Sequence, residues 1–166
     1  MFHSINPKDL TGNVFSMIGD RWMLITAGTA QHCNTMTAAW GGLGVFWGEA
    51  SATCYIRPQR YTKEFVDRED YFTLSFFSDE WKPALTVCGK TSGRDTDKIA
   101  QCGLTPVAAE CGAPYFQQAE LVMVCRKRYV QDMDAAAIPQ DVKEKFYPQQ
   151  DYHTMYIGHV IEVLQK

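Results

Sequence analysis

Residues 51–77 read SATCYIRPQRYTKEFVDREDYFTLSFF and contain the clearest structural signals of the chain. The segment 51–57 alternates like a strand and ends at Pro58, and a proline favours extended backbone in the residue before it. The segment 71–77 is rich in aromatic and β-compatible residues and predicts a second strand. Between them, Thr62 is placed to cap a short helix. This stretch predicts a β fold with small helices at its margin.

The same kinds of pattern continue on both sides of this stretch. Further strands are predicted over 22–27, 35–40, 119–130 and 154–164. Short helices are predicted after Ser78, before Gly103 and from Pro139 to Phe146. Strands and helices do not alternate as in a doubly wound sheet. We therefore expect a mainly β fold, a closed or split antiparallel barrel with a few short peripheral helices.

The segment GGLGVFWGE, residues 41–49, is interpreted as a loop with embedded aromatic residues. No internal repeat or linker interrupts the chain, and 166 residues suit one domain over 1–166. Aromatic residues make up 13% of the chain, enough for core packing, for an interface or for the walls of a site for a flat ligand.

Charge and cysteine spacing exclude several classes of protein. With 19 acidic and 16 basic residues the net charge is −3, which argues against a nucleic-acid binder. No run approaches the roughly 18–20 apolar residues of a membrane span, and the N-terminus lacks the apolar core of a signal peptide. We expect a cytoplasmic protein without a membrane partner. Six cysteines form no CxxC or CxH pair, so we expect no metal site.

Two segments have the residue types of a ligand site. In Arg57–Pro58–Gln59–Arg60–Tyr61–Thr62, two arginines and a hydroxyl accompany a helix N-terminus, whose free N–H groups favour an anion. The same residues are also compatible with two surface arginines beside a helix cap. In Asn34–Thr35–Met36–Thr37, before Trp40, small polar residues leave backbone N–H groups and hydroxyls free for a ligand's heteroatoms. From the pattern alone, an ordinary turn into a strand is the simpler interpretation.

Two other polar segments are less specific. The segment 92–98 contains glycine, arginine and lysine and is typical of a solvated turn. His153 and His159 share strand parity with apolar residues, and either one can be structural. No spacing indicates a Ser–His–Asp or Cys–His pair, and no residue stands out as a nucleophile or general base. Anion-binding groups with many aromatics and no acid–base pair fit a cofactor that brings its own chemistry.

Taken together, these motifs resemble a known family. The run NTMTAAWGGLGVFWGEASATCYIRPQRYTKEFVDREDYFTLSFF (34–77) is similar to the flavin reductase-like family, with an FMN-binding split β-barrel, and more closely to its flavoredoxin-type branch. The similarity continues through CGKTSGRDTDKIAQCGLTP (88–106) and YHTMYIGHVIEV (152–163). Each motif is weak alone, but the ordered set covers most of the chain.

This resemblance implies a homodimer that binds FMN without a covalent link, near the subunit interface. By the resemblance, the segment 34–37 lies along the isoalloxazine ring and 57–62 receives the ribityl phosphate. Ser78 and Lys98 are then expected near the cofactor, with Lys98 as the cation beside the pyrimidine side of the ring. His153 is the one candidate for a direct role in the reaction. The cofactor-binding residues predicted in this way are Asn34, Thr35, Met36, Thr37, Trp40, Arg57, Arg60, Tyr61, Thr62, Ser78 and Lys98.

The resemblance leaves three functions open. The main hypothesis is an NAD(P)H-dependent flavin reductase, in which NADH or NADPH gives hydride to the flavin. Electrons then pass to free flavin, a small oxidant or a partner protein. The alternative is a flavoredoxin-like FMN electron carrier without its own nicotinamide reductase activity. The third is a barrel that has lost flavin and serves as a structural or regulatory module.

Overall fold

One open antiparallel sheet forms the body of the protein in the computed structural model, which describes residues 1–166. Its strand order is β3-β2-β6-β9-β10-β5-β4, and β1 pairs with β10 beside this path. The strands of the sheet are β1 (His3–Ile5), β2 (Met23–Gly28), β3 (Cys33–Ala38), β4 (Gly41–Phe46), β5 (Glu49–Ile56), β6 (Tyr71–Phe76), β9 (Leu121–Asp132) and β10 (Thr154–Gln165). A separate hairpin joins β7 (Pro106–Ala108) to β8 (Pro114–Phe116).

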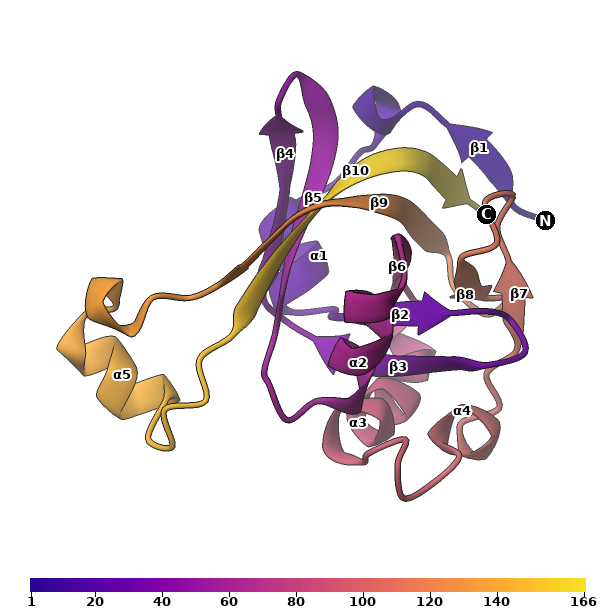
Figure 1. Cartoon of the computed structure of the whole chain (residues 1–166). Coiled ribbons are helices and arrows are strands. Elements are labelled where there is room, and N and C mark those ends of the chain that lie inside the picture. The colour runs from indigo at the N-terminus through magenta and orange to yellow at the C-terminus, as the bar shows by residue number, and fades with distance from the viewer.

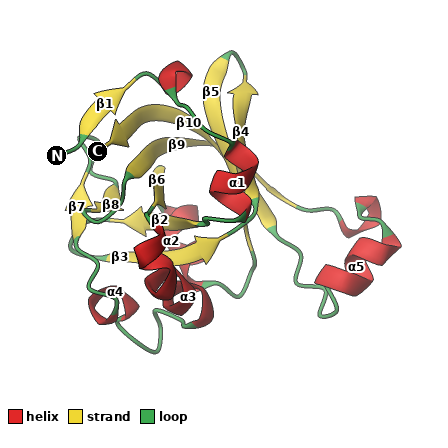
Figure 2. Cartoon of the chain, turned by 180° about the vertical axis from the view of Figure 1, so that it is seen from behind, coloured by secondary structure: helices red, strands yellow, loops and turns green.

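The helices are short and lie outside the curved sheet, as Figures 1 and 2 show. They are α1 (Val14–Gly19), α2 (Tyr61–Arg68), α3 (Lys82–Lys90), α4 (Lys98–Gln101) and α5 (Gln140–Phe146). Three single turns of 3-10 helix are η1 (Pro7–Asp9), η2 (Asp79–Trp81) and η3 (Ala135–Ala137). None of these helices combines the length and the hydropathy of a membrane-spanning segment.

The central strands of the sheet are buried on both faces, because their alternate residues enter two different cores. In β6, Phe72, Leu74 and Phe76 belong to the core inside the barrel. In β9, Val122 and Val124 belong to a second core, to which α3 and the β7–β8 hairpin also contribute. This second core holds α3 against the barrel.

The close packing of β10 on β9 and β6 requires a glycine at position 158. A Cβ on Gly158 would lie 2.8 Å from Cβ of Cys125 and 2.8 Å from Cζ of Phe72. The register between β9 and β10 also shifts between Ile157 and Gly158, as a β-bulge does. The bend lets both twelve-residue strands run past the barrel.

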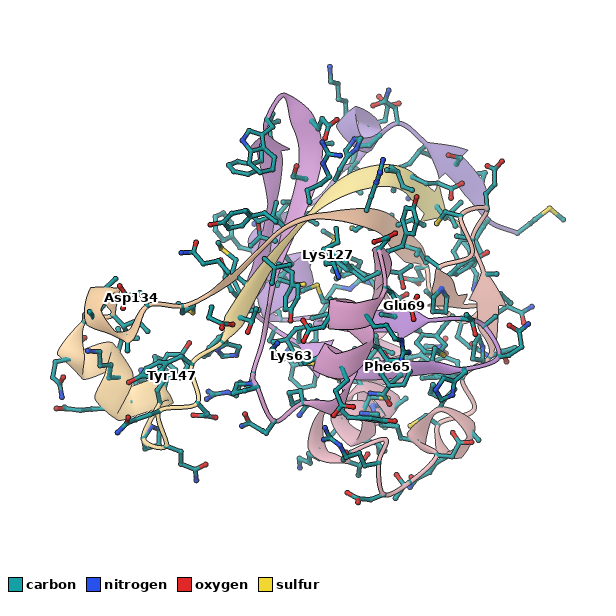
Figure 3. The ribbon with its side chains drawn as sticks, in the orientation of Figure 1. Lys63, Phe65, Glu69, Lys127, Asp134 and Tyr147 are labelled. Atoms are coloured by element: carbon teal, nitrogen blue, oxygen red, sulfur yellow. The ribbon has the colours of Figure 1, made fainter.

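Beyond the barrel, the ends of β9 and β10 carry residues 133–153, which we call the arm. The arm includes η3 and α5 and projects away from the sheet (Figure 1). Figure 3 labels Asp134 and Tyr147 on this arm. The arm returns to the barrel through Tyr147, Asp151 and His153, whose contacts are described below.

The predicted mainly β, split-barrel fold with peripheral helices is confirmed, but two local predictions are wrong. Residues 41–46 form edge strand β4, because their backbone pairs with β5 from Gly41–Cys54 to Phe46–Glu49. A tight turn at Trp47 and Gly48, both with positive φ, joins the two strands. Thr62 does not cap α2: the N-cap is Arg60, and Thr62 is buried in the first turn.

Candidate functional site

Two adjoining cavities bring together most of the predicted site residues. The first, of about 170 Å³, is the polar cavity, and the second, of about 260 Å³, is the central cavity. Arg60 lines both of them. The polar cavity is lined by Asn34, Gln59, Arg60, Tyr61, Thr62, Lys90, Thr91, Ser92, Gly93 and Lys98. The central cavity is lined by Met36, Thr37, Ala38, Ala39, Trp40, Tyr55, Arg57, Arg60 and His153.

The C-terminal end of α3 positions two cations of the polar cavity. Arg60 Nη1 donates to the carbonyl of Gly89 at 2.7 Å, and its Nη2 donates to that of Cys88 at 3.4 Å. Lys98 Nζ donates to the carbonyls of Cys88 and Thr91, each at 3.0 Å. These carbonyls at a helix C-terminus are uncharged but attract cations. Neither cation has a carboxylate partner, so both positive charges remain uncompensated.

Burial changes the titration of this pair. Lys98 is only 3% exposed, and desolvation lowers its pKa to about 8, with Arg60 contributing repulsion. Burial also lowers the pKa of Arg60 from its usual value. An anion entering the polar cavity would relieve both effects, because it would stabilise the charged forms.

The opposite wall of the polar cavity is the N-terminus of α2. Arg60, the N-cap, makes no side-chain capping bond, so no side chain caps the first N–H groups of the helix. Asn34 Nδ2 donates to Thr62 Oγ1 at 2.7 Å, which ties β3 to this helix end. A Cβ on Gly93 would lie 2.0 Å from Oδ1 of Asn34, so the loop after α3 approaches β3 closely. Backbone N–H groups, hydroxyls and cations thus surround one small space, and this set fits a phosphate.

Arg57 lies in the central cavity, and the arm neutralises its charge. Its Nη1 donates to Oδ2 of Asp151 at 2.7 Å, and its Nη2 donates to the carbonyl of Phe146 at 2.9 Å. The guanidinium also lies 5.0 Å from the centre of the Tyr147 ring. Burial raises the pKa of Asp151, but hydrogen bonds from Gln59 and Arg57 lower it further, so it ends below its usual range. Arg57 therefore fastens the arm to the barrel.

His153 stands between the arm and the cavity wall. Its Nδ1 is 2.8 Å from the hydroxyl of Tyr147, and its ring is 5.2 Å from that of Trp40, between centres. Burial, and secondarily the charge of Arg57, lowers the pKa of His153 to about 4, so the ring is neutral at pH 7. Trp40 is 42% exposed and also packs edge-on against Phe146. The wall of the central cavity therefore combines the flat ring of Trp40 with a neutral imidazole.

Three predicted hydroxyl-bearing site residues form hydrogen bonds within the protein, and two of them, Thr35 and Ser78, line neither cavity. Thr35 lies inside the barrel, where its hydroxyl bonds with Thr26 Oγ1 and the carbonyl of Ile25. Ser78 lies outside both cavities and donates to Glu80. Thr37 lines the central cavity, and its hydroxyl donates to the carbonyl of Leu85. The role of each in binding a cofactor stays a prediction.

The structure adds three residues that the sequence motifs did not single out. Tyr55 and Tyr147 lie beside His153, and Lys90 lines the polar cavity. Tyr55 could have been found from strand parity, because it alternates with the buried Cys54 and Ile56. No sequence signal points to Tyr147, which meets the barrel only through the fold of the arm.

Comparison with solved structures shows the same fold in several proteins. Flavoredoxin of Desulfovibrio vulgaris (Miyazaki F) matches with a TM-score of 0.68 and 24% identity, over 87% of this chain and 69% of that one. Flavoredoxin from Methanosarcina acetivorans matches with a TM-score of 0.71 and 17% identity, over 98% and 76%. An FMN-binding domain of a flavin reductases-like enzyme from Shewanella baltica OS155 gives 0.71 and 17%, over 99% and 77%.

A search of curated proteins finds no match. The family model described as "Flavin reductase like domain" matches residues 16–166. This match includes β2 to β10 and both cavities, and with the split-barrel fold it shows that the chain belongs to the flavin reductase-like family.

Proposed function

We propose that the protein is an FMN-dependent oxidoreductase that accepts hydride from NADH or NADPH. The observation that carries this proposal is the polar cavity, where Arg60 and Lys98 hold uncompensated positive charge beside the N-terminus of α2. The polar cavity adjoins the central cavity, whose lining includes residues of β3 and Trp40. Several relatives of the same fold are described as flavoredoxins or FMN-binding proteins, which supports FMN as the ligand.

In this proposal the protein contacts FMN at two places, the phosphate and the isoalloxazine ring. Arg60, Lys98 and the α2 N-terminus bind the phosphate, while Met36 and Thr37 on β3 border the ring. Lys98 shares its cavity with Arg60, so we assign it to the phosphate rather than to the pyrimidine edge. Bound FMN would supply the hydride and electron transfer. The protein positions the ring and limits its contact with water, and no side chain needs to act as acid or base.

Exposed apolar side chains on the β4–β5 hairpin and on β9 fit contact with a second copy of the chain. Val45 and Trp47 at the tip of the β4–β5 hairpin are 78% and 61% exposed, and Val130 is 45% exposed. Such exposure is typical of interfaces. We propose a homodimer, and sedimentation at several concentrations tests it: a monomer at all concentrations contradicts it.

The spectrum of the purified protein tests the cofactor. A flavin absorption band, with FMN identified after denaturation, is the expected result. A colourless protein that fails to bind added FMN would instead support the hypothesis of a structural or regulatory barrel that has lost flavin.

A second candidate is an FMN electron carrier without nicotinamide reductase activity. It is favoured by a larger cavity next to the central one whose lining contains no cation to hold the pyrophosphate of a dinucleotide. Rapid mixing with NADH and NADPH separates the two functions. Bleaching of the flavin band by either donor supports the reductase. Reduction by an electron-transfer protein alone supports the carrier.

A further inference from the structure

A third cavity, of about 700 Å³, opens beside the central one. The two share Ala39, Trp40, Tyr55 and His153. Its other lining residues come from α1, β4 and the arm; they are Val14, Phe15, Ile18, Gly19, Gly41, Gly42, Leu43, Met133 and Tyr147. We call it the uncharged cavity, because its wall contains no Asp, Glu, Lys or Arg, whereas the polar and central cavities both contain arginine.

Two polar groups in this wall have no partner within the protein. His153 uses Nδ1 toward Tyr147, but its Nε2 makes no hydrogen bond and is not sealed from solvent. The hydroxyl of Tyr55 is likewise unpaired and accessible. An apolar cavity with a few convergent polar groups is the usual form of a small-molecule site.

We assign the tautomer of His153 from the two neighbours of the Tyr147 hydroxyl. This hydroxyl has one proton, and its two neighbours are Nδ1 of His153 at 2.8 Å and the sulfur of Met133 at 3.8 Å. A thioether is a much weaker acceptor than the unprotonated nitrogen of an imidazole, so we assign the hydroxyl proton to Nδ1. Nε2 of the neutral ring then carries the remaining proton, and it is a hydrogen-bond donor at the cavity wall.

We propose that the uncharged cavity binds the second substrate of the enzyme, an uncharged, flat carbonyl compound of the quinone class. Trp40 provides a flat wall, and His153 Nε2 and the Tyr55 hydroxyl donate to the carbonyl oxygen. A sulfonated or phosphorylated molecule would lose hydration there and find no cation in return. The assignment of this ligand as a substrate depends on the proposed function, whereas its binding does not.

Calorimetric titration of the FMN-loaded protein with two probes tests this proposal. The probes are 2-methyl-1,4-naphthoquinone and 1,4-naphthoquinone-2-sulfonate, which share a ring system and differ in charge. We expect the uncharged probe to bind about tenfold more tightly or better, because a sulfonate in this cavity would lose hydration and gain no cationic partner. Equal affinities, or tighter binding of the sulfonate, overturn the proposal.

Two glycines of β4 provide a matched pair of variants. A Cβ on Gly42 or on Gly44 would meet no atom within 4 Å, so both positions tolerate a side chain. Gly42 pairs with Thr53, two residues from Tyr55 on the same face, and it lines the cavity, whereas Gly44 does not. Gly42→Leu should weaken quinone binding about tenfold by occupying the space, and Gly44→Leu should leave it within about twofold.

Flavin content and sedimentation, measured on the same samples, separate the outcomes. If the samples bind FMN but not the quinone, this proposal fails and the proposed function stands. If they bind the quinone but not FMN, the proposed function fails alone. If Gly42→Leu changes the oligomeric state but not the quinone affinity, a second copy covers the cavity and the proposal is overturned.

Discussion

Arg57 and Arg60 are three residues apart, yet the charge of Arg57 is neutralised by a carboxylate and that of Arg60 is not. Arg57 pairs with the carboxylate of Asp151 and fastens the arm. Arg60 bonds only to backbone carbonyls at the end of α3. A carboxylate cancels a positive charge, whereas a carbonyl orients it and leaves it available to an anion. Of the two arginines, we therefore expect Arg60 to contribute more to phosphate binding, whereas Arg57 links the arm to the barrel.

The largest expected effect comes from removing each arginine in turn. Arg60→Ala should weaken FMN binding about a hundredfold, because a charge-assisted bond to phosphate contributes roughly 1.5–3 kcal/mol. Arg57→Ala should weaken it by about threefold or less, since Asp151 already holds that charge. Fluorescence titration of flavin gives both affinities. Equal losses would abolish the distinction, and no loss in the double variant would remove the phosphate assignment altogether.

The next effect concerns pH and Lys98. Because the pKa of Lys98 is about 8, its ammonium loses the proton above that pH and the polar cavity loses one charge. FMN affinity should fall by up to about tenfold between pH 7 and 9, while the phosphate remains a dianion. Lys98→Met should bind FMN more weakly at pH 7 and show a flat profile up to pH 9. A wild-type profile that is equally flat contradicts the role of Lys98.

The stability of the flavin-free protein should change in the opposite direction. A lysine whose pKa is lower in the folded state binds fewer protons there than in the unfolded chain. Between pH 8 and the ordinary lysine pKa, the contribution of Lys98 to the free energy of unfolding should therefore rise with pH. Urea titration of wild type and Lys98→Met at pH 8 and 10 measures this difference.

A smaller effect is expected from Asp151→Asn, which frees Arg57. The free energy of unfolding should fall by about 1 kcal/mol at pH 7, since a half-buried, hydrogen-bonded ion pair is lost. The folded pKa of Asp151 is lowered, so its contribution is present above pH ~4 and is lost as the pH falls through the folded pKa. The difference between wild type and variant should shrink toward pH 3. A difference that stays constant with pH would show that the pair is not its source.

The smallest effect links Arg57 to His153. The charge of Arg57 is the second cause of the low pKa of His153, after burial. Arg57→Met should therefore raise the pKa of His153 above 4, but only part of the way to its ordinary value. Proton NMR of the imidazole measures it. Because the folded state binds fewer protons, stability falls as the pH drops from about 6.5 to 4, and the variant should lose less.

The sequence predicted the polar cavity better than the arm, for a physical reason. The cation-bearing motifs at 57–62 and 92–98 sit at helix ends, and short local patterns encode such ends. The pairing of Arg57 with Asp151 spans 94 residues, and no local pattern encodes it. The local motif therefore predicts a phosphate ligand at Arg57 but cannot predict its ion pair with Asp151.

Strand prediction shows the same limit. The segment 71–77 was predicted as a strand from its aromatic and β-compatible residues, and β6 covers 71–76. β4 was missed because three of its six residues are glycine and its partner strand β5, rather than its own composition, keeps it extended. The uncharged cavity was missed for the same reason, since β4 forms part of its wall.

The carbonyls at the end of α3 have a consequence for the speed and strength of binding. Arginine and lysine side chains each lose up to about 2 kcal/mol of rotamer entropy when a ligand has to order them. Here the fold has already immobilised Arg60 and Lys98 on Cys88, Gly89 and Thr91. Binding of a phosphate then requires no side-chain reorganisation, so we expect the association rate to approach the rate at which the anion diffuses into the cavity. Differences in affinity between variants should then arise mainly from the dissociation rate of the complex.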